Sequence, residues 1–121
     1  MNATVQEHRQ YPRKIVEQSV EVLDNETGST LGYLEDVSRE GFGLVTSQPV
    51  SPLDVKQVTL NLPGPQGNQY TVRMIAQCIW CQPRKESSNA LVGFQLRDID
   101  EQNAVALNYF IRDYKVSSEQ Q

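Results

Sequence analysis

The chain has 121 residues, 38% of them hydrophobic and 21% charged, which suits one folded domain with a single core. Its formal net charge of −4 argues against general binding to a nucleic-acid polymer, because such binding needs a basic surface. A small anionic ligand is not excluded, since its binding depends on local charge rather than on total charge.

Both ends of the sequence are polar. We expect residues 1–8 to form a flexible lead-in and residues 115–121, with the sequence KVSSEQQ, to form a disordered tail. No segment reaches the length of a membrane-spanning helix, and the lead-in lacks the apolar stretch of a signal peptide. These features predict a cytoplasmic protein without membrane insertion, in which Cys78 and Cys81 are reduced thiols.

Alternating apolar residues predict about six antiparallel strands in the middle of the chain. The turn sequence DNETG separates the first two strands, and a loop rich in proline and glycine separates the fourth and fifth, which is typical of hairpins. The predicted strands cover residues 19–23, 30–38, 41–46, 55–62, 70–81 and 91–96. The fifth strand would place on one face Tyr70, Val72, Met74, Ala76, Cys78 and Trp80.

The hydrophobic period changes near the end of the chain, where an apolar stripe at helical spacing predicts a helix over residues 100–114. The stripe consists of Leu107, Phe110, Ile111 and Tyr114. Asp98 followed by Glu101 is typical of a capped helix start. Strands at this spacing indicate a small closed barrel, with the helix over an open face or edge. The predicted fold is therefore all-β, a six-stranded antiparallel β-barrel with a C-terminal helix.

The first of two short motifs is the sequence RQYPR, which begins at Arg9 and ends at Arg13. Pro12 fixes its own φ and biases the preceding residue away from helical backbone, so residues 9–14 should form an extended or turned arm. Arginine presents a planar fork of donors to phosphate oxygens, and it can also bind the O6/N7 edge of guanine or stack on a base. Two arginines on a mobile arm therefore suit a ligand with phosphates and guanines.

The second motif is DVSREG, which places Asp36, Ser38 and Gly41 where a strand ends. On an extended segment Asp36 and Ser38 project from the same face. A carboxylate can accept from the N1–H and N2–H₂ donors of guanine, and a hydroxyl can donate or accept. Gly41 allows a close backbone approach or a positive φ. Together the motifs predict that the arm recognises an anion and the strand end recognises a base.

RxxxR followed by DxSxxG resembles the signature of PilZ domains, which are bacterial receptors for cyclic di-GMP. The resemblance covers nearly the whole chain, because the segments Cys78-Ile79-Trp80 and Val92-Gly93-Phe94 are similar to the Trp-bearing and Gly-Phe strands of that family. It implies a PilZ-like barrel domain over residues 9–114 that binds cyclic di-GMP, with no cofactor. The residues it implies in binding are Arg9, Arg13, Asp36, Ser38 and Gly41.

The resemblance also implies a downstream protein partner, since such receptors act in motility, pilus or exopolysaccharide control.

Four residues are secondary candidates for ligand contact, namely His8, Lys14, Arg39 and Trp80. In the family, the position of His8 is associated with binding one ligand or a stacked pair, so the stoichiometry stays open. Arg39 can simply pair with a neighbouring glutamate, and Trp80 fits a core or barrel-wall residue better than a base-stacking platform.

Three other classes of function have weaker support: a redox or metal site, an enzyme and an oligonucleotide-binding barrel. Cys78 and Cys81 form a CxxC pattern, but residues three apart on a strand face opposite sides and lie about 10 Å apart, too far for a disulfide or a shared metal. With His8 as the only histidine, no nucleophile and base can be assembled, so we do not expect an enzyme. An oligonucleotide-binding barrel would need a basic, aromatic-rich groove, and only 7% of the residues are aromatic. The main alternative is a PilZ-like protein-interaction module that does not bind nucleotide.

Overall fold

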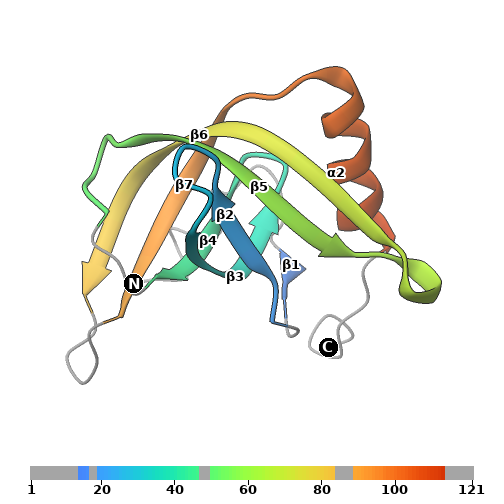
Figure 1. The fold of residues 1–121 in the computed structure, drawn as a ribbon, viewed down its shortest axis with the longest axis horizontal. Helices are drawn as coiled ribbons and strands as arrows, with labels where there is room; N and C mark the ends of the chain where they lie inside the picture. The colour runs from blue at the N-terminus through green and yellow to red at the C-terminus, as the bar shows by residue number, and fades with distance from the viewer. Residues whose placement is uncertain (1–13, 17–18, 47–49, 84–88, 114–121) are drawn as a thin grey trace, which may run out of the picture.

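The computed structural model describes residues 14–16, 19–46, 50–83 and 89–113, and its elements are drawn in Figure 1. Strands dominate the described residues, and an α-helix follows the last of these strands. The elements are β1 (Lys14–Ile15), β2 (Glu21–Asp24), β3 (Thr30–Ser38), β4 (Gly41–Thr46), β5 (Val55–Pro63), the short 3₁₀ turn η1 (Pro65–Gly67), β6 (Gln69–Pro83), β7 (Ala90–Asp98) and α2 (Glu101–Asp113).

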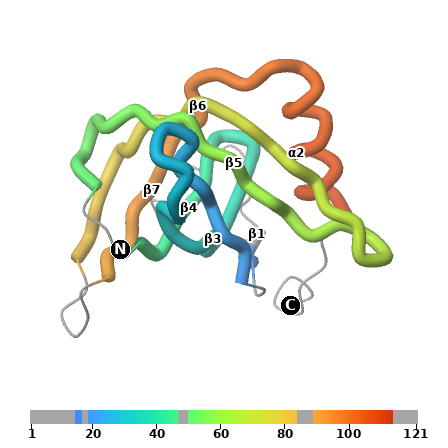
Figure 2. The backbone as a smooth tube through the Cα atoms, viewed as in Figure 1, coloured from blue at the N-terminus to red at the C-terminus, as the bar shows by residue number. Residues whose placement is uncertain are grey.

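Six of the strands form a closed antiparallel ring in the order β2-β3-β4-β7-β6-β5, with β5 paired back to β2. The backbone tube in Figure 2 shows the same barrel, with α2 along β6. Closure pairs both edges of each ring strand, which removes the open edges that would otherwise invite aggregation. The prediction of a six-stranded antiparallel barrel with a C-terminal helix is confirmed. β1, which the sequence did not predict, pairs with β3 as a seventh strand.

The barrel interior is filled by the apolar residues whose alternation predicted the strands. Phe42 on β4 and Phe94 on β7 are a directly opposed pair, and their rings stack with centroids 5.2 Å apart. Leu107 and Phe110 of the predicted helical stripe are buried in the same core. Among the described residues, no helix is long and apolar enough to cross a membrane.

The capping residue of α2 lies two positions later than predicted, because Asp100 rather than Asp98 is the cap. Oδ1 of Asp100 accepts hydrogen bonds from the backbone N–H of Asn103 at 2.8 Å and from its side-chain amide at 2.9 Å. Asp98 instead lies in β7, opposite Ile75. A capping residue must directly precede the first helical residue, and Asp98 stands too early in the chain. Asn103 also accepts the backbone N–H of Arg73 at 2.8 Å, which ties the helix start to β6.

Strand β6 follows the predicted face as far as Cys78 and then departs from it. The register shifts between Cys78 and Trp80, so that Ile79 is the extra residue of a β-bulge. Cys78 is fully buried, whereas Trp80 is 42% exposed and points outward. Cys81 returns to the core side, opposite the buried Val92. The expectations that Trp80 shares a face with Cys78 and that the two cysteines face opposite sides are therefore wrong.

Both cysteines are free thiols in the structure, despite lying on one face. Burial raises the pKa of the Cys78 thiol, which opposes the thiolate that redox and metal chemistry require. The residues that the structure describes contain no group of three or more His, Cys, Asp or Glu side chains that could hold a metal ion.

Leu53 combines two unfavourable features, since its φ is 78° and its side chain is 73% exposed. Its backbone N–H donates to the carbonyl of Cys78 at 2.7 Å, and its carbonyl accepts the side chain of Gln77 at 3.2 Å. These bonds hold a left-handed conformation that costs a non-glycine residue about 1–2 kcal/mol.

We therefore expect Leu53→Gly to be more stable than Leu53→Ala by about 1 kcal/mol. Both variants lose nearly all of the same exposed side chain, and only glycine relieves the positive φ. At an ordinary position the order would be reversed, because glycine loses more backbone entropy on folding. Urea unfolding of the two variants measures the difference, and a less stable Leu53→Gly would contradict the backbone conformation described above.

A second prediction concerns the cap of α2. Hydrogen bonds from the backbone and side chain of Asn103 lower the pKa of Asp100, so the ionised carboxylate stabilises the fold at neutral pH. That contribution is present above the unfolded pKa of about 4 and is lost as the pH falls through the lower folded value. Asp100→Ala should lower the melting temperature at pH 7, and the difference in melting temperature between this variant and wild type should become smaller in acid. The control, Asp98→Ala, should cause a smaller loss at pH 7, and a gap for Asp100→Ala that does not change with pH would contradict the assignment.

Candidate ligand-binding site

The DVSREG motif forms the end of β3, a tight turn and the start of β4. Ser38 pairs with Gly41 across the hairpin, so Arg39 and Glu40 occupy the turn. Oγ of Ser38 accepts the backbone N–H of Glu40 at 3.1 Å, a local bond that serine often makes at a turn. The carbonyl of Glu40 accepts the N–H of Leu96 at 2.6 Å, which fastens the turn to β7. The hairpin that carries the motif is thus held from two sides.

Asp36 and Ser38 lie on the outer face of the barrel. Between them, Val37 pairs with Phe42, and both of these residues are fully buried in the core. Because side chains alternate along a strand, the two polar residues point away from the core on a common side. Asp36 is partly exposed, whereas Ser38 is only 1% exposed. The carboxylate is therefore the more accessible group of the motif.

Gly41 is needed for a close approach between strands. A Cβ on Gly41 would lie 2.0 Å from the carbonyl oxygen of Phe94 on β7, far closer than real atoms pack. The sequence suggested either a close backbone approach or a positive φ for Gly41. Its φ is not positive, so the structure supports the close approach. Gly43 has a related role, because a Cβ there would lie 3.0 Å from Oδ1 of Asp36. The carboxylate of Asp36 thus lies across Gly43.

A row of paired residues crosses the outer face from β3 to β6. Asp36 on β3 pairs with Gly43 on β4. Gly43 pairs in turn with Gly93 on β7, and Gly93 pairs with Trp80 on β6. The indole of Trp80 covers Gly93, where a Cβ would lie 2.3 Å from Nε1. We call these four residues the glycine row. Its two glycines carry no side chains, a carboxylate and an aromatic ring lie over them, and the row spans about 14 Å at ordinary strand spacing.

Strand β1 brings the segment that follows the arginine motif to the same place. Lys14 pairs with Val37, and Ile15 pairs with Asp36. The N-terminal end of β1 therefore faces the β3–β4 turn. Two residues are too few to show an alternating pattern, so sequence periodicity could not predict this strand.

Three of the candidate ligand residues lie outside the described part of the chain, namely His8, Arg9 and Arg13. The side chain of Lys14 is likewise not described. The structure brings Asp36 and Trp80 to opposite ends of one row, and this connection was not visible from the sequence. The bulge at Ile79 is what turns Trp80 outward, and a bulge leaves no reliable mark on hydrophobic periodicity.

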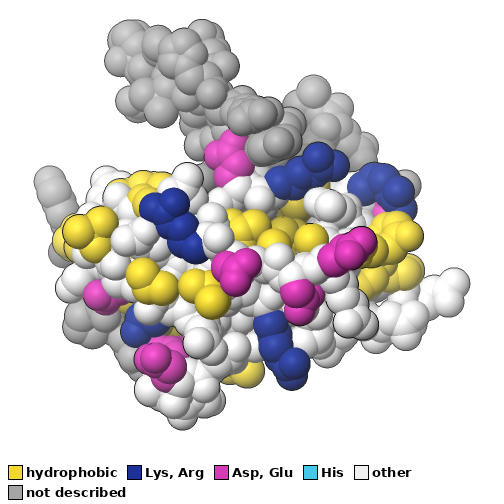
Figure 3. Space-filling model, turned by 90° about the horizontal axis from the view of Figure 1, so that it is seen from above, with side chains coloured by type: hydrophobic (Ala, Val, Ile, Leu, Met, Phe, Trp, Pro, Cys, Tyr) yellow, Lys and Arg dark blue, Asp and Glu magenta, His cyan; other side chains and the backbone are white. Residues whose placement is uncertain are grey.

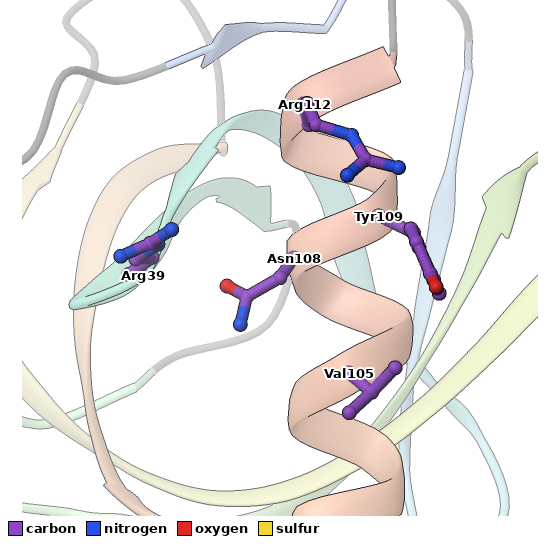
Figure 4. A pocket seen from close by; sticks show the side chains of 5 residues that line it. All are labelled: Arg39, Val105, Asn108, Tyr109 and Arg112. Carbon is purple, nitrogen blue, oxygen red and sulfur yellow. The ribbon is translucent and has the colours of Figure 1, made fainter.

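Arg39 is exposed in the turn and borders a hollow of about 230 Å³ between the turn and α2, shown in Figure 4. The other lining residues are Val105, Asn108, Tyr109 and Arg112. Elsewhere, on the face drawn in Figure 3, the basic side chains of the described residues are distributed among acidic ones rather than gathered in one patch. This distribution does not suit a nucleic-acid polymer on that face.

The family model for the PilZ domain matches residues 7–113. The chain belongs to the PilZ domain family. This assignment confirms the resemblance carried by the two motifs. No curated protein matches the chain.

Solved structures share the PilZ fold at low sequence identity. YcgR from Escherichia coli in complex with c-di-GMP is similar with a TM-score of 0.70 and 19% identity over 93% of this chain and 48% of that chain. The PilZ domain of the same protein with c-di-GMP has a TM-score of 0.68 and 17% identity, over 93% of this chain and 95% of that chain. The inhibitor of motility MotI/DgrA from Bacillus subtilis has a TM-score of 0.68 and 18% identity, over 87% of this chain and 50% of that chain. This PilZ chain therefore spans about half the length of YcgR and of MotI.

The glycine row of this PilZ domain can be tested through Trp80, the only tryptophan in the chain. Gly93→Ala places a Cβ 2.3 Å from Nε1 of Trp80, so the indole must move away from the backbone of residue 93. We expect a red shift of the tryptophan emission maximum, with the far-UV circular dichroism unchanged. Gly28→Asn is the control, because a Cβ at Gly28 meets nothing within 4 Å and asparagine tolerates the φ of +77° there. Identical emission spectra of Gly93→Ala and wild type would contradict the contact.

Proposed function

We propose that this chain is a cytoplasmic, non-enzymatic receptor that binds cyclic di-GMP between the arginine arm and the outer face of the barrel at the β3–β4 hairpin. The observation that carries the proposal is the pairing of Lys14 and Ile15 with Val37 and Asp36. It joins the end of one motif to the strand that carries the other. Membership of the PilZ family and the similarity to proteins solved with c-di-GMP support the same ligand.

Chain connectivity puts both arginines within reach of this face. Consecutive Cα atoms lie about 3.8 Å apart, and an extended chain gains at most about 3.6 Å per residue. The Cα of Arg13 therefore lies about 4 Å from that of Lys14, and the Cα of Arg9 lies within about 18 Å of it. From these positions, both guanidinium groups can bind phosphates of a ligand that lies beside Asp36.

The glycine row suits a purine base. The Asp36 carboxylate can accept the N1–H and N2–H₂ donors of guanine, which adenine does not offer as a pair. Gly43 and Gly93 let the carboxylate of Asp36 and the indole of Trp80 lie close to the barrel backbone. A base can then bind beside the carboxylate, and the indole offers an aromatic surface at the far end of the row. Ser38 contributes mainly by holding the turn through its bond to Glu40, with its hydroxyl proton left for the ligand. Gly41 permits the close strand packing that keeps this face flat.

Ligand binding would transmit a signal by changing the surface that the protein presents to a partner. The arm closes over the ligand, its residues become ordered, and a downstream protein partner recognises the ordered form. Motility, pilus function and exopolysaccharide synthesis are the processes in which we expect that partner. The similarity to an inhibitor of motility favours the first of these.

One observation favours the alternative of a protein-interaction module that does not bind nucleotide. Ser38 is almost fully buried, and its Oγ is already used by the turn. If the DVSREG motif served only to shape the hairpin, Ser38 would have the same burial and the same hydrogen bond. Titration of the wild type with cyclic di-GMP separates the two proposals, since the alternative predicts no binding.

Removing the arginines should weaken cyclic di-GMP binding. A charge-assisted hydrogen bond contributes about 1.5–3 kcal/mol, so Arg9→Ala and Arg13→Ala should each reduce affinity at least about tenfold in titration calorimetry. The double variant should nearly abolish binding. Arg73→Ala is the matched control, because Arg73 is exposed on β6 opposite Thr59 and away from the glycine row. Wild-type affinity in the double variant would refute the arginine arm.

Base recognition needs a second experiment. Wild type should prefer cyclic di-GMP to cyclic di-AMP and to GTP, and Asp36→Asn should reduce the preference between the two cyclic dinucleotides. An amide can accept at only one oxygen and presents donors where the carboxylate presents acceptors. Unchanged preference in Asp36→Asn would exclude the carboxylate as the reader of guanine.

A further inference from the structure

The hollow between the β3–β4 turn and α2 is formed by groups that suit an anion. In Figure 4, Asn108 extends from the helix toward Arg39 on the turn, and Arg112 lies one helical turn beyond Asn108. Both helical side chains line the hollow, and the guanidinium group of Arg112 extends from there toward the ring of Tyr109. The lining described above contains two arginines and no carboxylate.

Arg112 makes two side-chain contacts that use only part of its guanidinium group. Its Nε donates to Oδ1 of Asp113 at 3.0 Å, and its guanidinium carbon lies 4.8 Å from the ring centroid of Tyr109. Both contacts orient the guanidinium group. The Asp113 contact uses Nε, so it leaves the terminal nitrogens available to bind an oxyanion bidentately.

The size of the hollow indicates what part of a ligand it can hold. Pockets that bind a whole small molecule measure roughly 300–1,000 Å³. At about 230 Å³ this hollow is too small for an entire cyclic dinucleotide. It is large enough for a phosphodiester group with part of its sugar.

The hollow adjoins the candidate ligand site through the chain itself. Arg39 follows Ser38 directly and shares its hairpin turn. The N-terminal end of β1, to which the arginine arm is attached, faces that same turn. A ligand that extends from Asp36 past the turn would therefore reach the hollow next.

We propose that Arg39 and Arg112 form an additional phosphate subsite of the ligand site, with the amide of Asn108 as a further donor. This inference rests on the proposed binding of cyclic di-GMP and assigns α2 a direct part in it. One phosphodiester of the ligand would connect the β3–β4 turn to the C-terminal half of the helix. The helix would thus be held by ligand and could report its presence to a partner.

Calorimetry with cyclic di-GMP tests the subsite. Arg39→Ala and Arg112→Ala should each weaken binding by about tenfold, as expected for loss of a charge-assisted contact. Arg39→Lys and Arg112→Lys should give intermediate affinities, because lysine keeps the charge and loses the fork. Gln102→Ala, an exposed change on α2 outside the hollow, is the control and should bind like wild type.

Hydrogen exchange provides a readout that a merely structural role would not change. Cyclic di-GMP should protect backbone amides in the last turns of α2 in wild type and in Gln102→Ala. That protection should be absent in Arg39→Ala and Arg112→Ala, even at ligand concentrations that saturate them.

The outcomes distinguish this inference from the function on which it rests. If wild type does not bind cyclic di-GMP, the proposed function and the subsite both fail. If wild type binds and the two arginine variants bind as tightly as Gln102→Ala, only the subsite is overturned. In that case the cationic hollow is better suited to an acidic segment of a partner protein.

Discussion

The close approach of β4 to β7 is the constraint on which the candidate site depends. These strands complete the barrel, and their backbones come so near at Gly41 that any side chain there would collide with the carbonyl of Phe94. The pairing of the same two strands aligns Gly43 with Gly93, and on the outer face the side chains of Asp36 and Trp80 lie over these glycines. A larger residue at Gly41 would force the strands apart and open the ring that the core requires, whereas one at Gly43 or Gly93 would displace the side chain that lies over it.

The site is assembled from parts with different physical tasks. The stacked pair of Phe42 and Phe94 lies on the core side of the same two strands, so the packing that stabilises the barrel also fixes the spacing of the outer face. Ser38 secures the turn, and Asp36 presents the accessible charge. A rigid face of this kind can bind a ligand without reorganising, and the proposed function therefore assigns the conformational change to other parts of the chain.

Much of the fold was predictable because it follows local rules. Period-two alternation located the six ring strands, and helical spacing located α2 to within one residue at each end. The departures have specific causes. Ile79 inserts a bulge that reverses the direction of Trp80, and Asp100 takes the capping position that Asp98 is too early to occupy. Neither the bulge nor the cap changes the pattern of apolar residues enough to be predicted from that pattern.

By itself, the sequence determined the family, the barrel and the two motifs, because residue identity and spacing express backbone preference, burial and hydrogen-bonding capacity. Only the tertiary structure decided which side chains meet. Pairing across β3, β4, β7 and β6 joins Asp36 to Trp80, which stand 44 positions apart in the chain. Packing of α2 likewise places Arg112 and Arg39 around one hollow. Such contacts depend on strand register and helix placement, which arise from the packing of the whole core rather than from any short segment.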